Sequence, residues 1–152
     1  METDFATRNK NRIGEPKAME YLERRQTRYM RFGLDALDTD YPIWKIPSPI
    51  RSAPDWIVFN DYDEAFFFEA KTFRGEAKFK IQDMKNYRRW NNDMPIIFFL
   101  YDIGNKAFCE VTFNELTHKI VNNKLEIKSF PESEKNTYYS IPVSVLPDFT
   151  NF

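Results

Sequence analysis

Runs of apolar side chains, interrupted by short polar turns, divide the chain into predicted elements of secondary structure. Residues 55–59 and 65–72 are rich in aromatic and aliphatic side chains and flank an Asn-Asp-Tyr-Asp-Glu turn, which predicts a hairpin of two strands. The apolar run 95–102 is typical of a strand that is covered on both faces. Residues 106–111 are expected to return beside it through an Ile-Gly-Asn turn.

Helical periodicity and end signals predict three helices, at about residues 15–31, 79–92 and 112–122. Pro16 suits the first turn of the first helix, where a missing N–H costs nothing. Thr112 and Glu115 have the spacing of a capping box at the start of the third helix.

Weaker patterns fill the rest of the chain. Three prolines favour a loop over residues 33–52, with one short strand near 43–46. Two further strands are expected at about 125–130 and 138–141. The order of elements predicts an α/β or α+β protein with helices packed on a sheet. A chain of 152 residues, with Phe as its main apolar filler at 15 copies, has the size of a single domain spanning residues 1–152.

Composition excludes several kinds of site. The 22 basic and 23 acidic residues give a net charge of −1, so a nucleic-acid site must come from local clustering of charge. With one cysteine and one histidine, neither an intramolecular disulfide nor a Cys/His zinc site can form. No apolar run approaches the ~18 residues of a membrane span, and residues 1–14 are too polar for a signal peptide. We therefore expect no membrane partner and a cytoplasmic location, in the host cytoplasm if the protein is viral.

Three charged residues within the apolar hairpin are candidates for chemistry: Asp55, Glu69 and Lys71. Charges in a half-buried strand are costly unless something pairs with them. Antiparallel pairing would place Asp55 beside Glu69 and Lys71, which share one face of their strand. Two neighbouring carboxylates favour a cation, either Lys71 or a hard divalent metal such as Mg²⁺ or Mn²⁺. A metal there could activate water and neutralise a phosphate, and Lys71 could orient or deprotonate that water.

These residues carry a resemblance to a known family. Pro54–Asp55, thirteen residues, and then Glu69–Ala70–Lys71 resembles the motif of the PD-(D/E)XK nucleases, the restriction-endonuclease-like superfamily. The resemblance implies an α-β-β-β-α-β core at about residues 13–111, a mixed sheet flanked by helices, and extra C-terminal strands and a helix over residues 112–152. It also implies Asp55, Glu69 and the Ala70 carbonyl as ligands of Mg²⁺, for which Mn²⁺ can substitute, and Lys71 as the catalytic lysine.

Two outlying residues extend the resemblance. Residues 14–22 are similar to the opening helix of the Holliday-junction-resolvase and RecB-like branches, and they imply Glu15 as a further site residue and metal ligand. Gln82 matches a glutamine that supports the site in several branches. The RecB-like pattern has Tyr four residues after that glutamine, where this chain has Asn86 followed by Tyr87. The resolvase-like branch is the nearest in pattern, and it implies a possible homodimer acting on branched DNA.

Basic side chains follow the motif and are candidates for contacts with DNA phosphates: Lys78, Lys80, Lys85, Arg88 and Arg89. The commoner interpretation of such a cluster is a solvated helix face. With little room for a recognition domain, specificity would come from backbone shape, from dimerisation or from a protein partner.

The sequence therefore predicts a Mg²⁺-dependent deoxyribonuclease, an endonuclease in preference to an exonuclease, acting on DNA that is branched or otherwise structured. One alternative is a non-catalytic DNA-binding or assembly protein that retains the nuclease fold. Another is a structural protein whose Glu69 and Lys71 form an exposed ion pair of little energetic value. A second Glu-x-Lys, at Glu126 and Lys128, has no Pro-Asp before it at a suitable spacing. Duplex, single-stranded and RNA substrates stay open at this point.

Overall fold

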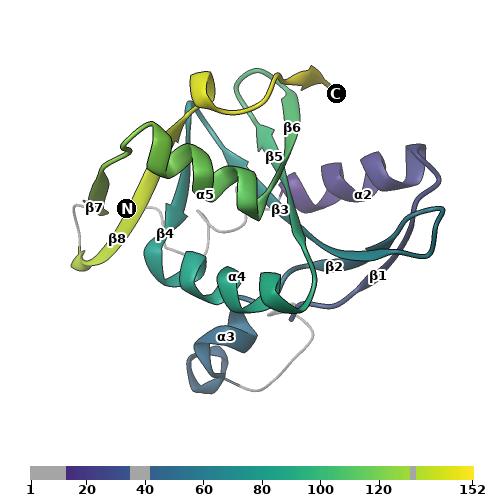
Figure 1. Cartoon of the computed structure of the whole chain (residues 1–152), viewed down its shortest axis with the longest axis horizontal. Helices are drawn as coiled ribbons and strands as arrows, with labels where there is room; N and C mark the ends of the chain where they lie inside the picture. The colour runs from purple at the N-terminus through teal and green to yellow at the C-terminus, as the bar shows by residue number, and fades with distance from the viewer. Residues whose placement is uncertain (1–12, 35–41, 131–132) are drawn as a thin grey trace.

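The computed structural model describes residues 13–34, 42–130 and 133–152, and its centre is a six-stranded sheet (Figure 1). The strand order is β1-β2-β3-β5-β6-β9. Strands β3 and β5 pair in parallel, and the other neighbours pair antiparallel, so the sheet is mixed as expected. The strands are β1 (Arg28–Arg31), β2 (Trp56–Phe59), β3 (Ala65–Phe73), β5 (Ile96–Asp102), β6 (Ala107–Thr112) and β9 (Thr150–Asn151).

A second, three-stranded antiparallel sheet packs against the first with the order β4-β8-β7. Its strands are β4 (Glu76–Lys80), β8 (Ser133–Pro142) and β7 (Ile127–Phe130). The helices are α2 (Gly14–Arg24), α3 (Ser48–Arg51), α4 (Ile81–Asp93) and α5 (Phe113–Asn122), with short 3-10 turns η2 (Ile43–Lys45) and η3 (Val143–Val145). Within the described part of the chain, no helix is both long and apolar enough to cross a bilayer.

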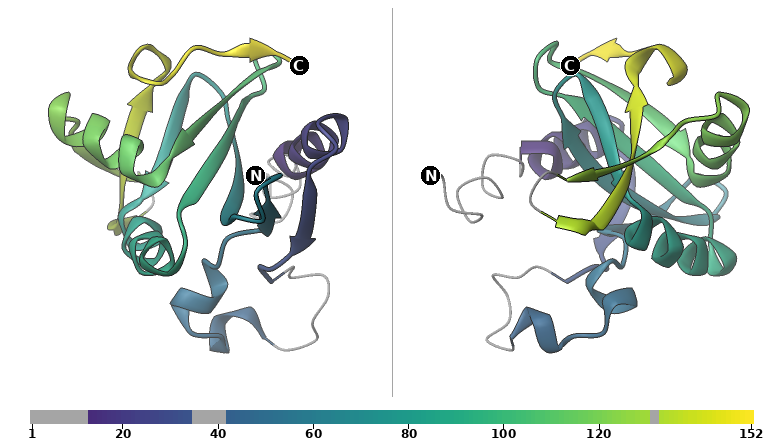
Figure 2. Two further views of the ribbon diagram at one scale, coloured as in Figure 1. Left: turned by 45° about the vertical axis from the view of Figure 1, so that its right-hand side comes forward. Right: turned by 90° about the vertical axis from the view of Figure 1, so that its left-hand side faces the viewer.

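The helices cover both faces of the central sheet, and each face has its own apolar core (Figure 2). Helix α2 packs on one face, where Ala18 and Leu22 meet Phe68 and Phe99. Helices α4 and α5 and the small sheet cover the other face, around Phe67 and Phe98. Strand β5 is buried on both faces, as its apolar run predicts.

The elements α2, β1, β2, β3, α4 and β5 occur in the predicted α-β-β-β-α-β order, with helices flanking a mixed sheet, and α3 and β4 are inserted between β1 and β2 and between β3 and α4. The helix expected at 15–31 is nevertheless too long, because α2 ends at Arg24 and Arg28–Arg31 form strand β1. Gln26 has a left-handed φ of 54°, which turns the chain back toward the sheet. Pairing of β1 with the open edge of β2 then satisfies the backbone of residues 28–31 better than a continued helix would.

The short strand expected at 43–46 is also wrong, since Ile43–Lys45 form the 3-10 turn η2. The Lys45 N–H bonds the Pro42 carbonyl, and the nearby prolines lack the N–H groups that a sheet ladder needs. The helix expected at 79–92 begins only at Ile81, because the preceding residues complete strand β4. Two predictions fall partly outside the described residues. They concern the polar N-terminus, of which residues 1–12 are not described, and the expected loop, of which residues 35–41 are not described.

The third helix begins as the capping box predicts. The Thr112 side chain accepts the Glu115 N–H at 3.1 Å, and α5 starts at the next residue, Phe113. Side chains from the region after this cap, among them Leu116 and Ile141, pack in the same core as Phe67. Residues 112–152 thus help to cover the face of the sheet that carries Glu69.

Candidate active site

The β2–β3 hairpin brings the two acidic residues of the motif together. Trp56 pairs with Phe68, so Asp55 lies beside Glu69 where the hairpin opens. The Asp55 N–H donates to Glu69 Oε2 at 2.9 Å, and the Ala70 N–H donates to Asp55 Oδ2 at 2.9 Å. Each carboxylate is therefore held by the backbone beside the other one, as antiparallel pairing of this hairpin predicts.

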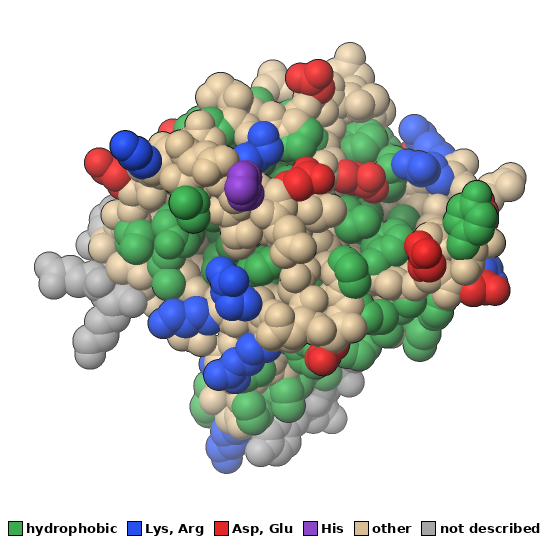
Figure 3. Space-filling view, viewed as in Figure 1, with side chains coloured by type: hydrophobic (Ala, Val, Ile, Leu, Met, Phe, Trp, Pro, Cys, Tyr) green, Lys and Arg blue, Asp and Glu red, His purple; other side chains and the backbone are tan. Residues whose placement is uncertain are grey.

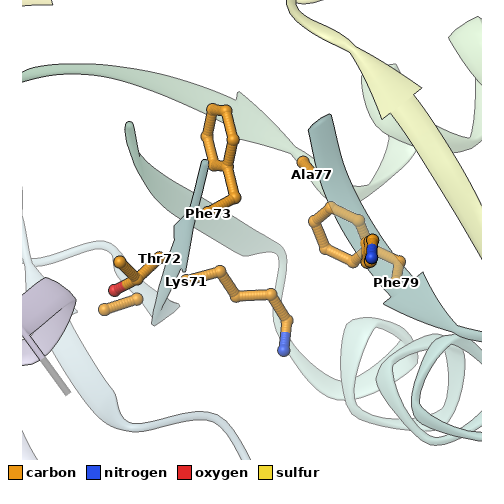
Figure 4. Close-up of a pocket in the computed structure, with 7 residues that line it drawn as sticks. Lys71, Thr72, Phe73, Ala77 and Phe79 are labelled. Atoms are coloured by element: carbon orange, nitrogen blue, oxygen red, sulfur yellow. The ribbon is translucent and has the colours of Figure 1, made fainter. Parts of the chain in front are cut away.

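Lys71 lies two residues further along β3, on the same face as Glu69. Its Nζ is 3.9 Å from Glu69 Oε1 and lies over the Tyr87 ring, 5.3 Å from the centroid. Figure 4 shows the Lys71 side chain directed toward β4 and Phe79, while Thr72 points the other way. A cavity of about 230 Å³ opens here between β3 and β4. Lys71 thus lines this hollow, whereas Asp55 and Glu69 do not.

The Glu69–Lys71 pair is largely covered by other side chains. The Lys71 side chain is 24% exposed and that of Glu69 only 11%. The alternative prediction, that these two residues form an exposed ion pair on an open sheet face, is therefore wrong. The α4 and β4 elements cover the face that carries them.

Two residues join the site that the sequence did not single out. The Tyr87 hydroxyl, on α4, donates to Glu69 Oε1 at 2.8 Å, although Tyr87 lies one residue beyond the tyrosine position of the RecB-like pattern. Arg31, on β1, has Nη1 3.3 Å from Glu15 Oε2 and Nη2 3.9 Å from Asp55 Oδ1. Pairing β1 with β2 places Arg31 opposite Trp56, but the prediction of a helix through residue 31 concealed this.

The other predicted site residues lie at different distances from the carboxylates. Glu15, in the first turn of α2, reaches Asp55 through Arg31, which contacts both acids. Ala70 contributes its N–H to Asp55 and pairs with Phe99 in the parallel ladder. Gln82 is exposed at the start of α4, and among the described residues no hydrogen bond joins it to either carboxylate. The structure thus brings Glu15 and Ala70 to the site but leaves Gln82 outside it.

The electrostatics of the pair disfavour two negative charges. Burial raises the pKa of Asp55 well above its ordinary value, and the charges of Glu69 and Glu15 raise it further. Burial also raises the pKa of Glu69, against the opposing effects of Lys71 and the Tyr87 hydroxyl. Burial and the charge of Glu69 raise the pKa of Tyr87 well above its usual value. The hydroxyl therefore stays protonated and donates a hydrogen bond to Glu69. The site is therefore short of positive charge.

This donor set fits a hard divalent cation. Among the described residues no group of three or more His, Cys, Asp and Glu side chains is assembled around one point. Mg²⁺ does not need one, because it typically binds one or two carboxylates and keeps waters or substrate phosphates as its other ligands. Asp55 and Glu69 supply that number of carboxylates. Because their pKa values are raised, a nearby cation would favour their ionised forms.

The five basic residues that were predicted to contact DNA are all exposed. Lys85, Arg88 and Arg89 lie on α4, and Lys78 and Lys80 lie on the outward face of β4. Figure 3 shows Lys and Arg side chains gathered over α4 and α3 on this face of the molecule. Arg88 also lies over the Phe113 ring, 5.5 Å from the centroid, which orders one cation of this group.

Comparisons with known proteins give a structural similarity but no family. No family model matches, and no curated protein matches. Among solved structures, that of D212, a nuclease from a fusselovirus, is similar with a TM-score of 0.49 and 12% identity, over 91% of this chain and 80% of that one. Similarity at this level establishes neither a family nor an activity, so the function must be argued from the site itself.

Proposed function

We propose that this protein is a metal-dependent nuclease of the PD-(D/E)XK type, which hydrolyses phosphodiester bonds of DNA. The observation that carries the proposal is the joined pair of Asp55 and Glu69, each bound to the backbone beside the other, with Lys71 next to them on β3. Such an arrangement is costly for folding alone, because both carboxyl groups are buried with raised pKa values. A site that gathers charge at a cost to stability is a candidate for chemistry.

Asp55 and Glu69 would hold Mg²⁺ or Mn²⁺ in this site, and the Ala70 carbonyl and Glu15 are proposed as further ligands. When bound, the metal would lower the pKa of a coordinated water and neutralise charge on the phosphate.

The chain's own residues would perform the remaining tasks. Lys71 carries its ammonium to the edge of the cavity between β3 and β4, where it would orient the attacking water and stabilise the charge that develops on the phosphate. Tyr87 fixes the orientation of Glu69 through its hydroxyl, and Arg31 fixes Asp55 relative to Glu15. These two contacts hold the carboxylates in place before a cation arrives, which is the preorganisation that catalysis needs.

The proposed substrate is DNA that is branched or otherwise structured, held by phosphate contacts from the exposed cations of α4 and β4. The net charge of −1 gives no general attraction to nucleic acid, so binding would depend on these local cations. Because a chain of this size has little room for a recognition domain, a homodimer could place one site on each of two arms of a branched substrate.

The test is cleavage of end-labelled duplex, single-stranded, flap and four-way-junction DNA, each in Mg²⁺, in Mn²⁺ and in EDTA. Glu69→Gln keeps the size of the side chain and removes its charge. Glu126→Gln is the matched control, because Glu126 belongs to the second Glu-x-Lys and is exposed. We expect metal-dependent cleavage that Glu69→Gln lowers by at least about 100-fold and Glu126→Gln leaves unchanged.

Three results would contradict the proposal. Equal loss in both variants, or equal activity, would show that Glu69 has no special part in the reaction. Binding of DNA without cleavage of any substrate in either metal would favour the alternative of a DNA-binding protein that retains the fold.

A further inference from the structure

A small projection between β1 and β2 has no part in the site described above. It comprises residues 42–53, which include η2 and α3, and it extends from the main body in every view (Figures 1 and 2). Its sequence, PIWKIPSPIRSA, holds two basic residues and no acidic one. Trp44 on η2 is 77% exposed, an unusual position for the residue type with the largest apolar surface.

Hydrogen bonds from α4 hold the projection in place. Asn86 Nδ2 donates to Ser48 Oγ at 2.9 Å and to Ser52 Oγ at 3.2 Å, and Ser52 Oγ donates to Asp83 at 3.1 Å. Trp90 Nε1 donates to the Pro49 carbonyl at 3.0 Å. Asn86 is only 1% exposed, so the amide that binds Ser48 and Ser52 is buried. The projection is therefore a built feature of the fold.

The projection borders the site and a polar groove. Ser52 precedes Asp55 by three residues, so the projection leads directly into the motif. Between α3 and the start of α4 lies a groove of about 490 Å³, and the residues that line it are Leu34, Ser48, Arg51, Ser52, Lys80, Gln82, Asp83 and Asn136. Hydroxyl, amide and cationic groups of this kind suit a phosphodiester backbone. Gln82, which does not reach the carboxylates, faces this groove instead.

We propose that the projection binds an unpaired nucleotide of the substrate, with Trp44 stacking on its base and Arg51 and Lys45 contacting the neighbouring phosphates. The inference rests on the proposed nuclease function and adds a substrate class to it. An exposed indole next to Lys45, in a segment that also carries Arg51 and no acidic side chain, is a combination that suits single-strand binding. Bases within an intact duplex are stacked on one another and cannot reach an indole. The projection therefore selects DNA with a single-stranded region.

Tryptophan fluorescence tests this directly, because the chain has three tryptophans and the other two are covered. Trp56 is 2% exposed, and Trp90 packs against the core. The protein would be titrated in EDTA with oligothymidylate and with a blunt duplex of equal length. We expect oligothymidylate to quench the emission and the duplex to leave it nearly unchanged.

Variants separate stacking from other effects. Trp44→Leu should abolish the quenching and weaken binding of oligothymidylate by about 5- to 150-fold, the equivalent of one lost stacked base. Trp44→Phe should retain most of the affinity, because a smaller ring still stacks. Tyr62→Leu is the control, since Tyr62 is an aromatic residue 87% exposed on the β2–β3 turn, and its loss should change nothing.

Three results would overturn the proposal: no quenching when oligothymidylate binds, equal binding by Trp44→Leu, or self-association that is lost in Trp44→Leu. The last result would make Trp44 a protein contact. No metal is present in this experiment, so its outcome is independent of cleavage. A protein that quenches as expected but cuts no DNA would contradict the nuclease proposal and leave this one standing.

Discussion

Asp55 and Glu69 illustrate at the residue scale how a site can oppose the stability of the chain that carries it. Burial raises the pKa of both carboxyl groups, and the charge of Glu69 raises the pKa of Asp55 further. The hydrogen bonds from Ala70, Asp55 and Tyr87 offset only part of that cost. A core of apolar residues in the same place would be easier to fold, so the acids are best explained by what they bind.

Asp55→Asn should make the metal-free protein more stable at neutral pH. The folded-state pKa of Asp55 is raised, so the folded protein binds this proton more tightly than the unfolded chain does. The stability of the wild type should then fall as pH rises from about 4 through the raised pKa and remain low above it. Asparagine cannot ionise, and its side-chain oxygen can still accept the Ala70 N–H.

Urea unfolding in EDTA, from pH 4 to pH 8, would measure this effect. The advantage of Asp55→Asn should be largest at pH 8 and should vanish near pH 4. The matched control is Asp61→Asn, at an exposed position in the β2–β3 turn, where no such trend is expected. A variant that is less stable than the wild type at pH 8 would show that the ionised form of Asp55 is well accommodated.

The sequence could predict three site residues because they depend only on local structure. Asp55, Glu69 and Lys71 belong to one hairpin, and the pairing of that hairpin follows from its pattern. Tyr87 and Arg31 reach the carboxylates from α4 and β1, through the packing of elements that are distant in the chain. Spacing along the sequence does not indicate such packing, so Tyr87 and Arg31 could not be predicted as site residues.

At the scale of elements, the site depends on how closely α2 approaches β3. A Cβ atom at Gly14 would lie 2.2 Å from Thr72 Oγ1, a distance that no pair of such atoms can occupy. Thr72 Oγ1 is itself buried and has no hydrogen-bond partner among the residues that the structure describes. The helix therefore packs against this hydroxyl with no space between them, and Glu15 follows Gly14 directly.

Gly14→Ala should destabilise the protein, and Thr72→Ala should restore what it loses. The second change removes the oxygen that the new methyl group meets, and it leaves no buried donor unpaired. A double-mutant cycle by urea unfolding should give a favourable coupling of about 1–3 kcal/mol. Gly104→Ala is the control, since its Cβ would meet the nearest atom at an ordinary 3.4 Å. Additive effects of the two changes would show that α2 can shift away from β3.

Element boundaries show where local patterns stop being informative. The helix that was predicted to reach residue 31 is interrupted at Gln26, because the open edge of β2 takes residues 28–31 as a partner strand. The third helix begins where predicted, because its cap is made by its own residues Thr112 and Glu115. Ends fixed by local hydrogen bonds were predictable, and ends fixed by a distant strand were not.

At the scale of the whole molecule, binding of nucleic acid has to overcome a slightly negative net charge. The exposed cations of α4 and β4 are expected to do this locally. If they contact phosphates, removal of two of them should weaken binding and reduce its dependence on salt.

Arg88→Ala combined with Arg89→Ala should lower the slope of log Kd against log salt by about 1–2, at the ~0.9 per phosphate contact expected for duplex DNA. The control is Arg24→Ala with Arg25→Ala, which removes two charges at the end of α2, on the opposite face of the central sheet. Fluorescence anisotropy in EDTA would give both slopes. An unchanged slope for the α4 variant would mean that the DNA follows another path.

The most direct test of the central claim is the single-turnover cleavage rate of Lys71→Ala in saturating Mn²⁺, beside Lys128→Ala from the second Glu-x-Lys. We predict that Lys71→Ala cuts at least about 100-fold more slowly than the wild type, while Lys128→Ala is unaffected. The rise in melting temperature on adding Mn²⁺ should be similar for both variants, because the carboxylates remain. Cleavage by Lys71→Ala at the rate of the wild type would contradict a site built from two carboxylates and this lysine.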